Sequence, residues 1–237
     1  MTRDPIPVRS VSTLECRNCG AGAPVDEHFR PQCDRILALG RYGDYFTFFG
    51  LPRRLGLDRQ DLERRFRDLS RKFHPDYFYN APPAERLASL ERSSYLNDAY
   101  RVLRDPAARI EHLLAIEGLP PVKHEGGDGN AKVPAALLEE VFALNEELDE
   151  IREARESGGD PAQLATRLAK ARAPIERKRD EHELRIQELS EQWDRQEGAP
   201  AAERRATLEA LREQLLERTY ISNLIASIQR EAALTNG

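Results

Sequence analysis

The sequence is poor in aromatic residues, in cysteine and in long apolar runs, and each shortage excludes a class of protein. Aromatic residues make up 7% of the 237 positions, with a single Trp. No apolar run approaches the roughly 20 residues that a membrane-spanning helix needs, so we expect no membrane partner. The net charge of −5 gives no overall attraction for nucleic acid. The first 14 residues lack the apolar core of a secretion signal, and we expect a cytoplasmic protein.

Only three cysteines are present, all within the first 33 residues, which argues against a disulfide framework. Cys16 and Cys19 form a CxxC pair that could grip a zinc ion from a tight turn, and Cys33 adds a third thiolate. A second CxxC pair would need a cysteine where the chain has Arg30, so a four-cysteine site is excluded. His28 is the best fourth ligand for one structural zinc ion. The alternatives are a degenerate knuckle without metal, or the poorer ligands Asp26 and Asp34.

What the chain does contain is helix, and the expected fold class is all-α. Charged residues make up 32% of the positions, and apolar residues recur at helical spacing. We expect four parts. Residues 1–40 form a cysteine-containing segment that resembles a zinc knuckle and could bind a metal, and residues 41–118 form a helical hairpin with a short following helix. Residues 119–133 form a linker with two prolines and three glycines, and residues 134–237 form an antiparallel bundle of three helices. Pro174 lies inside the second bundle helix and predicts a kink or a local break.

The most informative stretch is His74-Pro75-Asp76, because an amphipathic segment lies on either side of it. The apolar positions that mark one face of each predicted helix are Leu62, Phe66, Leu69 and Phe73 before the tripeptide, and Leu96, Ala99, Tyr100 and Leu103 after it. Pro75 ends the first helix, so the tripeptide lies at the tip of a hairpin. A His and an Asp displayed there predict a docking point on another protein. Asp105 and Pro106 are suited to begin the short helix that follows.

The helix before the tripeptide is basic, with a net charge of +3 over residues 59–72. Such a charge steers encounter with an acidic partner surface, although a solvated helix face is the alternative. His74 and Asp76 make a poor catalytic dyad, because no nucleophile stands at a suggestive spacing and Pro75 leaves little room for the two side chains to pair. We therefore expect no catalytic residue, no nucleotide or organic cofactor, and no enzyme.

Three stretches carry a resemblance to a known family: Asp-Tyr-Phe-Thr-Phe-Phe-Gly-Leu-Pro at 44–52, Phe-His-Pro-Asp at 73–76, and residues 95–106 around Asn-Asp-Ala-Tyr. They resemble the J-domain of HscB, the branch of DnaJ-type co-chaperones that serves iron–sulfur cluster assembly. The resemblance implies that the hairpin docks on a DnaK/HscA-type chaperone and stimulates its ATPase. The docking residues that we assign on this basis are His74, Pro75, Asp76, Arg64, Arg65, Arg67, Arg71 and Lys72.

The first bundle helix carries a second candidate surface. Leu138 and Phe142 fall one residue after core positions, and residues 137–156 have a net charge of −6. An apolar pair prolonged by carboxylates would bind protein, although the pair could merely widen the buried stripe. Residues 146–151 match a motif of the HscB family, which binds its iron–sulfur scaffold protein through this region. By that resemblance the scaffold-binding residues are Leu138, Phe142, Glu146, Glu150 and Tyr220.

Other interpretations stay open. The linker sequence Leu-Pro-Pro-Val-Lys at 119–123 resembles the peptide by which a dedicated chaperone recognises iron–sulfur scaffolds, and a stiff linker is the simpler explanation. The chain could be a general J-domain adaptor for another client or a self-associating scaffold. A zinc-dependent nucleic-acid or scaffolding protein is a third possibility, which the acidic balance disfavours.

Overall fold

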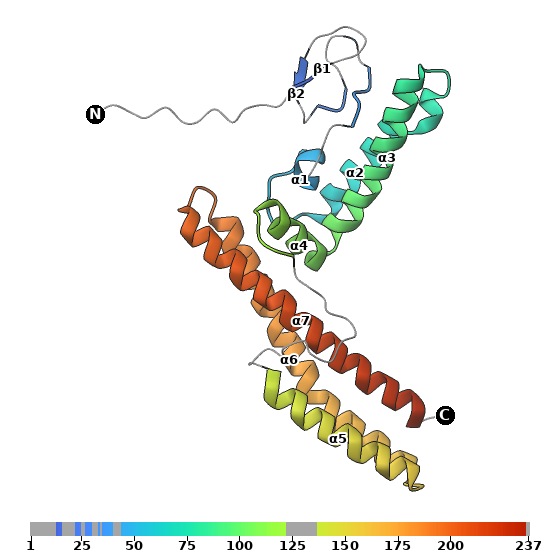
Figure 1. Ribbon diagram of the computed structural model, residues 1–237, viewed down its shortest axis with the longest axis vertical. Coiled ribbons are helices and arrows are strands. Elements are labelled where there is room, and N and C mark those ends of the chain that lie inside the picture. The colour runs from blue at the N-terminus through green and yellow to red at the C-terminus, as the bar shows by residue number, and fades with distance from the viewer. Residues whose placement is uncertain are drawn as a thin grey trace, which may run out of the picture. The chain divides into compact units, whose positions relative to one another are not determined.

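The computed structural model describes residues 13–15, 22–24, 27–29, 33, 35–39, 44–121 and 137–235. The chain divides into two compact units, Met1–Ile116 and Glu117–Gly237. Both are built from α-helices, as Figure 1 shows, which confirms the expected all-α class for these parts of the chain. None of the helices that the structure describes combines the length and the apolarity needed to cross a lipid bilayer.

The N-terminal segment contains a feature that the sequence analysis did not predict. Strands β1 (Thr13–Glu15) and β2 (Gly22–Pro24) pair antiparallel, with Leu14 opposite Ala23. Further along, an isolated antiparallel bridge joins Phe29 to Ile36. Three residues are too few to show the alternation of apolar and polar side chains that identifies a strand, so the sequence could not predict β1 and β2. The zinc-knuckle description of this segment remains a prediction.

The first unit contains a very short helix, a helical hairpin and a closing helix: α1 (Tyr45–Phe48), α2 (Arg59–Phe73), the 3₁₀ turn η1 (Pro75–Phe78), α3 (Pro83–Arg104) and α4 (Pro106–Ile116). Asp58 caps α2 by accepting a hydrogen bond from the Gln60 amide at 2.9 Å. Asp105 caps α4 in the same way, with the Ala108 amide at 2.8 Å, and Pro106 takes the first helical position as predicted.

The predicted apolar faces of α2 and α3 pack against each other. Leu62 and Phe73 on α2 and Leu96 on α3 are buried. Midway along the hairpin the ring of Phe66 stacks on that of Tyr100, with centroids 4.2 Å apart. The helical period of the sequence therefore predicted the hairpin correctly.

The second unit is a bundle of α5 (Leu138–Glu156), α6 (Pro161–Arg195) and α7 (Ala201–Thr235). Gly158 follows α5 with φ of +77°, a backbone conformation that favours glycine and ends the helix there. The three predicted seams meet in one core, whose fully buried members include Leu148 on α5, Leu168 on α6 and Ile221 on α7. Helix α6 continues through Pro174 without the local break that was one of the two predicted outcomes.

Glu231 is a buried carboxylate on α7, and it ties that helix to α5. Arg152 Nε lies 3.0 Å from one of its oxygens, and Arg155 pairs with the other. Because a buried charge is costly without partners, these pairs set the register of α5 on α7.

The first residues of the predicted linker are part of this second unit. Leu119 is buried, and Arg212 on α7 donates a hydrogen bond to the Pro120 carbonyl at 3.1 Å. Residues 122 and 123 lie outside the described part of the chain. Within residues 119–121, Leu119 is buried and the Pro120 carbonyl is held by α7, whereas the Pro120 and Pro121 side chains are exposed.

Candidate functional site

The His-Pro-Asp turn stands at the end of the hairpin, where α2 passes into η1. His74 is the C-cap of α2 and the N-cap of η1, and Pro75 takes the first position of the 3₁₀ turn. The Asp76 amide donates to His74 Nδ1 at 3.3 Å, so a neutral His74 ring carries its proton on Nε2. The Asp76 carboxylate is 87% exposed. The turn thus displays one N–H donor and one exposed carboxylate, and its role as a docking point remains a prediction.

One expectation about the turn was wrong in detail. Pro75 does not keep the two side chains apart, because His74 Nδ1 lies 3.5 Å from an Asp76 carboxylate oxygen. The 3₁₀ conformation folds residue 76 back over residue 74, which an extended His-Pro-Asp would not do. At 3.5 Å the contact is longer than a hydrogen bond, and the exposed carboxylate remains available to a cationic partner.

The base of the turn is held from two directions through Phe73. Its carbonyl accepts hydrogen bonds from Ser89 Oγ at 2.7 Å and Ser93 Oγ at 3.0 Å, both on α3. Its ring is fully buried, and the His28 ring lies against it with centroids 5.0 Å apart. The direction in which the following residues leave α2 is therefore set by contacts of the residue immediately before them.

Four large apolar side chains that follow the turn in the chain are exposed to water, and the sequence analysis did not assign them a role. Tyr77 and Tyr79 follow Asp76 and are 75% and 78% exposed, while Leu87 and Leu90 lie on the first turns of α3 and are each more than half exposed. Exposed apolar residues gathered beside polar ones are typical of protein-binding surfaces. Of these four, Leu87 and Leu90 could be recognised in the sequence because they fall off the buried face of α3, which contains Ala88 and Leu96.

The basic residues of α2 are exposed, but most are paired with acids of the same helix. Arg64 and Arg65 both contact Asp61, and their guanidinium groups hold the pKa of that carboxyl below its usual value, the Arg65 hydrogen bond most of all. Arg67 pairs with Glu63 at 3.5 Å. Such exposed pairs are weak and exchange readily with solvent or a partner, so they leave the net positive charge of the face intact.

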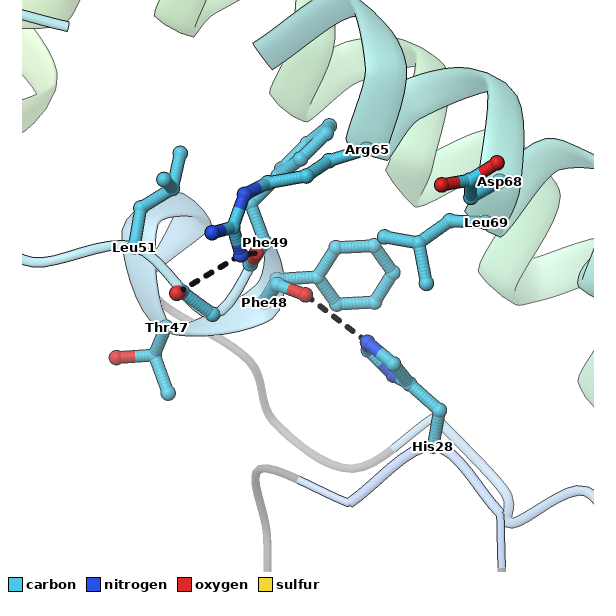
Figure 2. A pocket seen from close by; sticks show the side chains of 9 residues that line it. His28, Thr47, Phe48, Phe49, Leu51, Arg65, Asp68 and Leu69 are labelled. Carbon is cyan, nitrogen blue, oxygen red and sulfur yellow. Dashed lines mark hydrogen bonds between the residues drawn. The ribbon is translucent and has the colours of Figure 1, made fainter. Parts of the chain in front are cut away.

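Arg65 differs from the other predicted docking cations. Its guanidinium also donates to the Phe49 and Gly50 carbonyls, at 3.1 Å and 3.2 Å. Figure 2 shows the side chain turned toward the end of α1, beside a pocket of about 440 Å³ that His28 and Leu69 also line. Arg65 therefore anchors the loop between α1 and α2, a contact that sequence spacing could not reveal.

The predicted face of the bundle is exposed. Phe142 is 70% exposed and Leu138 is 38% exposed, so the pair does not simply extend the buried stripe of α5. Glu146 is exposed one turn further on. Glu150 is also exposed, but its carboxylate pairs with Arg167 of α6 at 2.5 Å, and the same guanidinium contacts Glu147 at 2.7 Å. Tyr220 is partly buried and packs against the bundle core.

The predicted zinc ligands fall partly outside what the structure describes. Cys16 and Cys19 lie outside the described residues, whereas Cys33 is half-buried against Leu37. Both ring nitrogens of His28 are engaged: Nε2 lies 2.9 Å from the Phe48 carbonyl oxygen, and Nδ1 lies 2.7 Å from a guanidinium nitrogen of Arg92. A metal ion on His28 would have to replace one of these bonds, so His28 does not fit the ligand role in this structure. In the described part of the chain no three His, Cys, Asp or Glu side chains could share an ion.

The chain combines a basic hairpin that carries an exposed His-Pro-Asp turn with a separate helical bundle, which is the architecture that the resemblance to a J-domain protein predicts. The chain matches no protein-family model. It is similar in structure to the human co-chaperone HscB, with 24% identity, a TM-score of 0.61, and coverage of 92% of this chain and 98% of that one. It is also similar to the chaperone HscB of Vibrio cholerae, with 25% identity, a TM-score of 0.51, and coverage of 81% and 99%. The resemblance to HscB-type co-chaperones is confirmed.

Proposed function

We propose that this protein is a co-chaperone of iron–sulfur cluster assembly, in which the first unit stimulates the ATPase of a DnaK/HscA-type chaperone and the bundle delivers the cluster scaffold protein. The observation that carries the proposal is the His-Pro-Asp turn, which is exposed at the end of a hairpin and followed in the chain by a bundle with its own exposed apolar face. The similarity to HscB over more than four-fifths of the chain supports the assignment.

In this proposal the chain hydrolyses nothing itself. Asp76 accepts a charge-assisted hydrogen bond from a cationic side chain of the chaperone, and His74 donates from Nε2 into the same contact. The exposed cations Arg64, Arg67 and Arg71 raise the rate of encounter with an acidic surface of the chaperone. The ATP and the reacting groups belong to the partner.

The bundle supplies the client end of the complex. Phe142 offers a large apolar side chain that is exposed in the free protein and would be desolvated by the scaffold. Glu146 prolongs that surface with negative charge, which selects a scaffold surface that carries cations. Glu150 adds to the same negative charge, because its pair with Arg167 is exposed and can exchange with a partner.

The test is the rate of ATP turnover by the chaperone, with and without the scaffold protein, in the presence of the wild-type chain or of His74→Gln. We expect stimulation of about tenfold or more by wild type and near-complete loss in the variant, because the ring at the docking turn is gone. Arg101→Gln, which changes an exposed residue of α3, is the control and should behave as wild type. Equal turnover with wild type and His74→Gln would contradict the proposal. Stimulation without any effect of the scaffold would favour a general adaptor for another client.

A further inference from the structure

Arg92 is an unusual residue for the middle of a helical hairpin. Its side chain is fully buried on α3, at a position four residues before the core residue Leu96. A buried guanidinium needs acceptors for its N–H groups, because leaving them unpaired costs far more than an exposed Arg would. The acceptors come from outside the hairpin.

Residues 27–29 and 35–39 supply them, and we refer to these two stretches together as the N-terminal clamp. Arg92 Nε donates to the Leu37 carbonyl at 2.8 Å, and Arg92 Nη2 donates to the Ala38 carbonyl at 3.3 Å. Arg92 Nη1 lies 2.7 Å from His28 Nδ1. Because a guanidinium can only donate, His28 Nδ1 accepts, and its Nε2 therefore carries the proton that goes to the Phe48 carbonyl. The two stretches are joined by the Phe29–Ile36 bridge and by the Leu37 amide, which donates to the His28 carbonyl at 3.1 Å.

The clamp and Arg92 converge on Phe73, the residue immediately before the His-Pro-Asp turn. The Arg92 guanidinium lies 5.7 Å from the centroid of the Phe73 ring. The Phe29 ring stacks on the same ring at 5.8 Å, and the His28 ring meets it edge-on at 5.0 Å. On α3, Ser89 and Ser93 flank Arg92 in sequence and hold the Phe73 carbonyl. Without the clamp, the face of Phe73 that these rings cover would be open to water.

We propose that Arg92 is a positioning residue for the docking turn, and that the N-terminal clamp acts through Arg92 and Phe73 to hold His74 and Asp76 in their docking geometry. The proposal rests on the function proposed above only for its readout on the chaperone. It assigns His28 to the clamp, as the acceptor that keeps Arg92 in place. The segment before the hairpin thereby becomes part of the structure that positions the docking turn.

The experiment uses the full chain and compares Arg92→Leu and His28→Phe with Arg109→Leu. Arg109 is a matched control because it is also buried in the first unit and also donates to backbone carbonyls, those of Leu55 and Leu103. His28→Phe keeps a ring against Phe73 but removes both hydrogen bonds, so it tests the clamp even if Arg92→Leu folds poorly. Circular dichroism establishes the folded fraction of each variant.

The first readout needs no chaperone: it is the hydrogen-exchange rate of the Asp76, Tyr77 and Tyr79 amides, which bond within the turn. We expect exchange about tenfold faster in Arg92→Leu and His28→Phe, since each loses hydrogen bonds that hold the base of the turn. Arg109→Leu should leave these three amides at the wild-type rate. Wild-type exchange in both clamp variants, or equal acceleration in the Arg109 control, would overturn the proposal.

The second readout separates positioning from contact. A loosened turn adopts the docking geometry for only part of the time. We therefore expect the concentration of this chain that gives half-maximal ATPase stimulation to rise by about tenfold, while the maximal stimulation stays unchanged. His74→Gln should instead lower the maximum. Arg92→Lys should restore part of the affinity, because an ammonium group can still donate to one clamp carbonyl. If wild type fails to stimulate the chaperone at all, the proposed function falls while the exchange rates still decide the role of Arg92.

Discussion

At the scale of single residues, His112 on α4 both joins two helices and responds to pH. Its Nε2 accepts a hydrogen bond from the Tyr45 amide at 3.0 Å, and its ring stacks on that of Tyr45 with centroids 4.3 Å apart. Burial lowers the pKa of His112, and the nearby Asp44 carboxylate opposes that shift only in part. At pH 7 the His112 ring is therefore neutral where it contacts Tyr45, the first residue of α1.

This geometry predicts an acid sensitivity of the first unit. Because the folded-state pKa of His112 is below its unfolded value of 6.5, its contribution to stability is complete above that pH. The contribution is lost as the pH falls below 6.5 and through the folded pKa, since protonation puts a donor against the Tyr45 amide. We expect the unfolding free energy of residues 44–116, measured by peptide-resolved hydrogen exchange, to fall between pH 7 and pH 5. His112→Gln, which cannot titrate, should show a flatter profile, and an unchanged slope would exclude His112 as the cause.

At the scale of elements, the face of α5 shows how one helix serves two purposes. Its core stripe, with Leu144 and Leu148, packs into the bundle, while Phe142 stands out of it. The exposure of a large aromatic ring beside a carboxylate has no stabilising role in the free bundle. The arrangement is the one that the proposed binding of a partner requires, because desolvation of such a ring is a major source of affinity at protein interfaces.

We expect Phe142→Ser to weaken binding of the scaffold protein by about tenfold or more, without loss of bundle stability. The measurement is the dissociation constant by isothermal titration calorimetry. Leu184→Ser is the matched control, since Leu184 is a similarly exposed apolar residue on α6. Equal losses in the two variants would mean that general surface hydrophobicity, rather than the α5 face, drives binding.

A second prediction at this scale concerns Pro174, which is exposed inside the continuous helix α6. A proline there removes one main-chain hydrogen bond and crowds the preceding turn, at a cost of about 3 kcal/mol relative to Ala. Pro174→Ala should therefore raise the unfolding free energy of the bundle by up to about 3 kcal/mol. Denaturant unfolding followed by the fluorescence of Trp193, the only Trp and a residue of the bundle core, measures it directly.

The matched control for this variant is Pro161→Ala. Pro161 occupies the first position of the same helix, where proline costs little, so its replacement should change stability by less than about 0.5 kcal/mol. A loss of stability in Pro174→Ala would show that the ring of Pro174 contributes packing in the groove between α5 and α6, which it lines.

At the scale of the whole molecule, the proposed function assigns the contacts with two partners to two separate units of the chain. The docking turn belongs to Met1–Ile116, and the α5 face belongs to Glu117–Gly237. Each unit has its own buried core, so a surface substitution in one need not disturb the other. A co-chaperone that links a client to an ATPase needs this independence of its two surfaces.

We therefore expect the two functions to separate cleanly. His74→Gln should bind the scaffold protein with wild-type affinity while losing stimulation of the chaperone. Phe142→Ser should keep the basal stimulation seen without scaffold and lose the further increase that scaffold produces. Chaperone ATP turnover and scaffold affinity, measured on the same preparations, check both expectations. Loss of scaffold affinity in His74→Gln would mean that the two surfaces are coupled.

The helical hairpin, the position of the docking turn and the bundle could all be predicted from the sequence. These features rest on local rules: a 3.6-residue apolar period, caps such as Asp58 and Asp105, and a proline that ends a helix. The tripeptide was visible for the same reason, since all of its residues are adjacent in the chain. The sequence could not predict whether Phe142 is exposed. A residue that lies next to the apolar stripe of a helix is buried or exposed according to how closely the neighbouring helices approach.

The contacts of His28, Arg65 and Arg92 exist only in the folded protein and could not be predicted from the sequence. The sequence predicts Arg65 as one more docking cation, yet its guanidinium donates hydrogen bonds to two carbonyls of the preceding loop. The sequence predicts His28 as a metal ligand and assigns Arg92 no role, yet the two are hydrogen-bond partners across 64 residues of sequence. A hydrogen bond between groups so far apart in the chain leaves no periodic trace, because what selects the two residues is the burial that folding imposes on both.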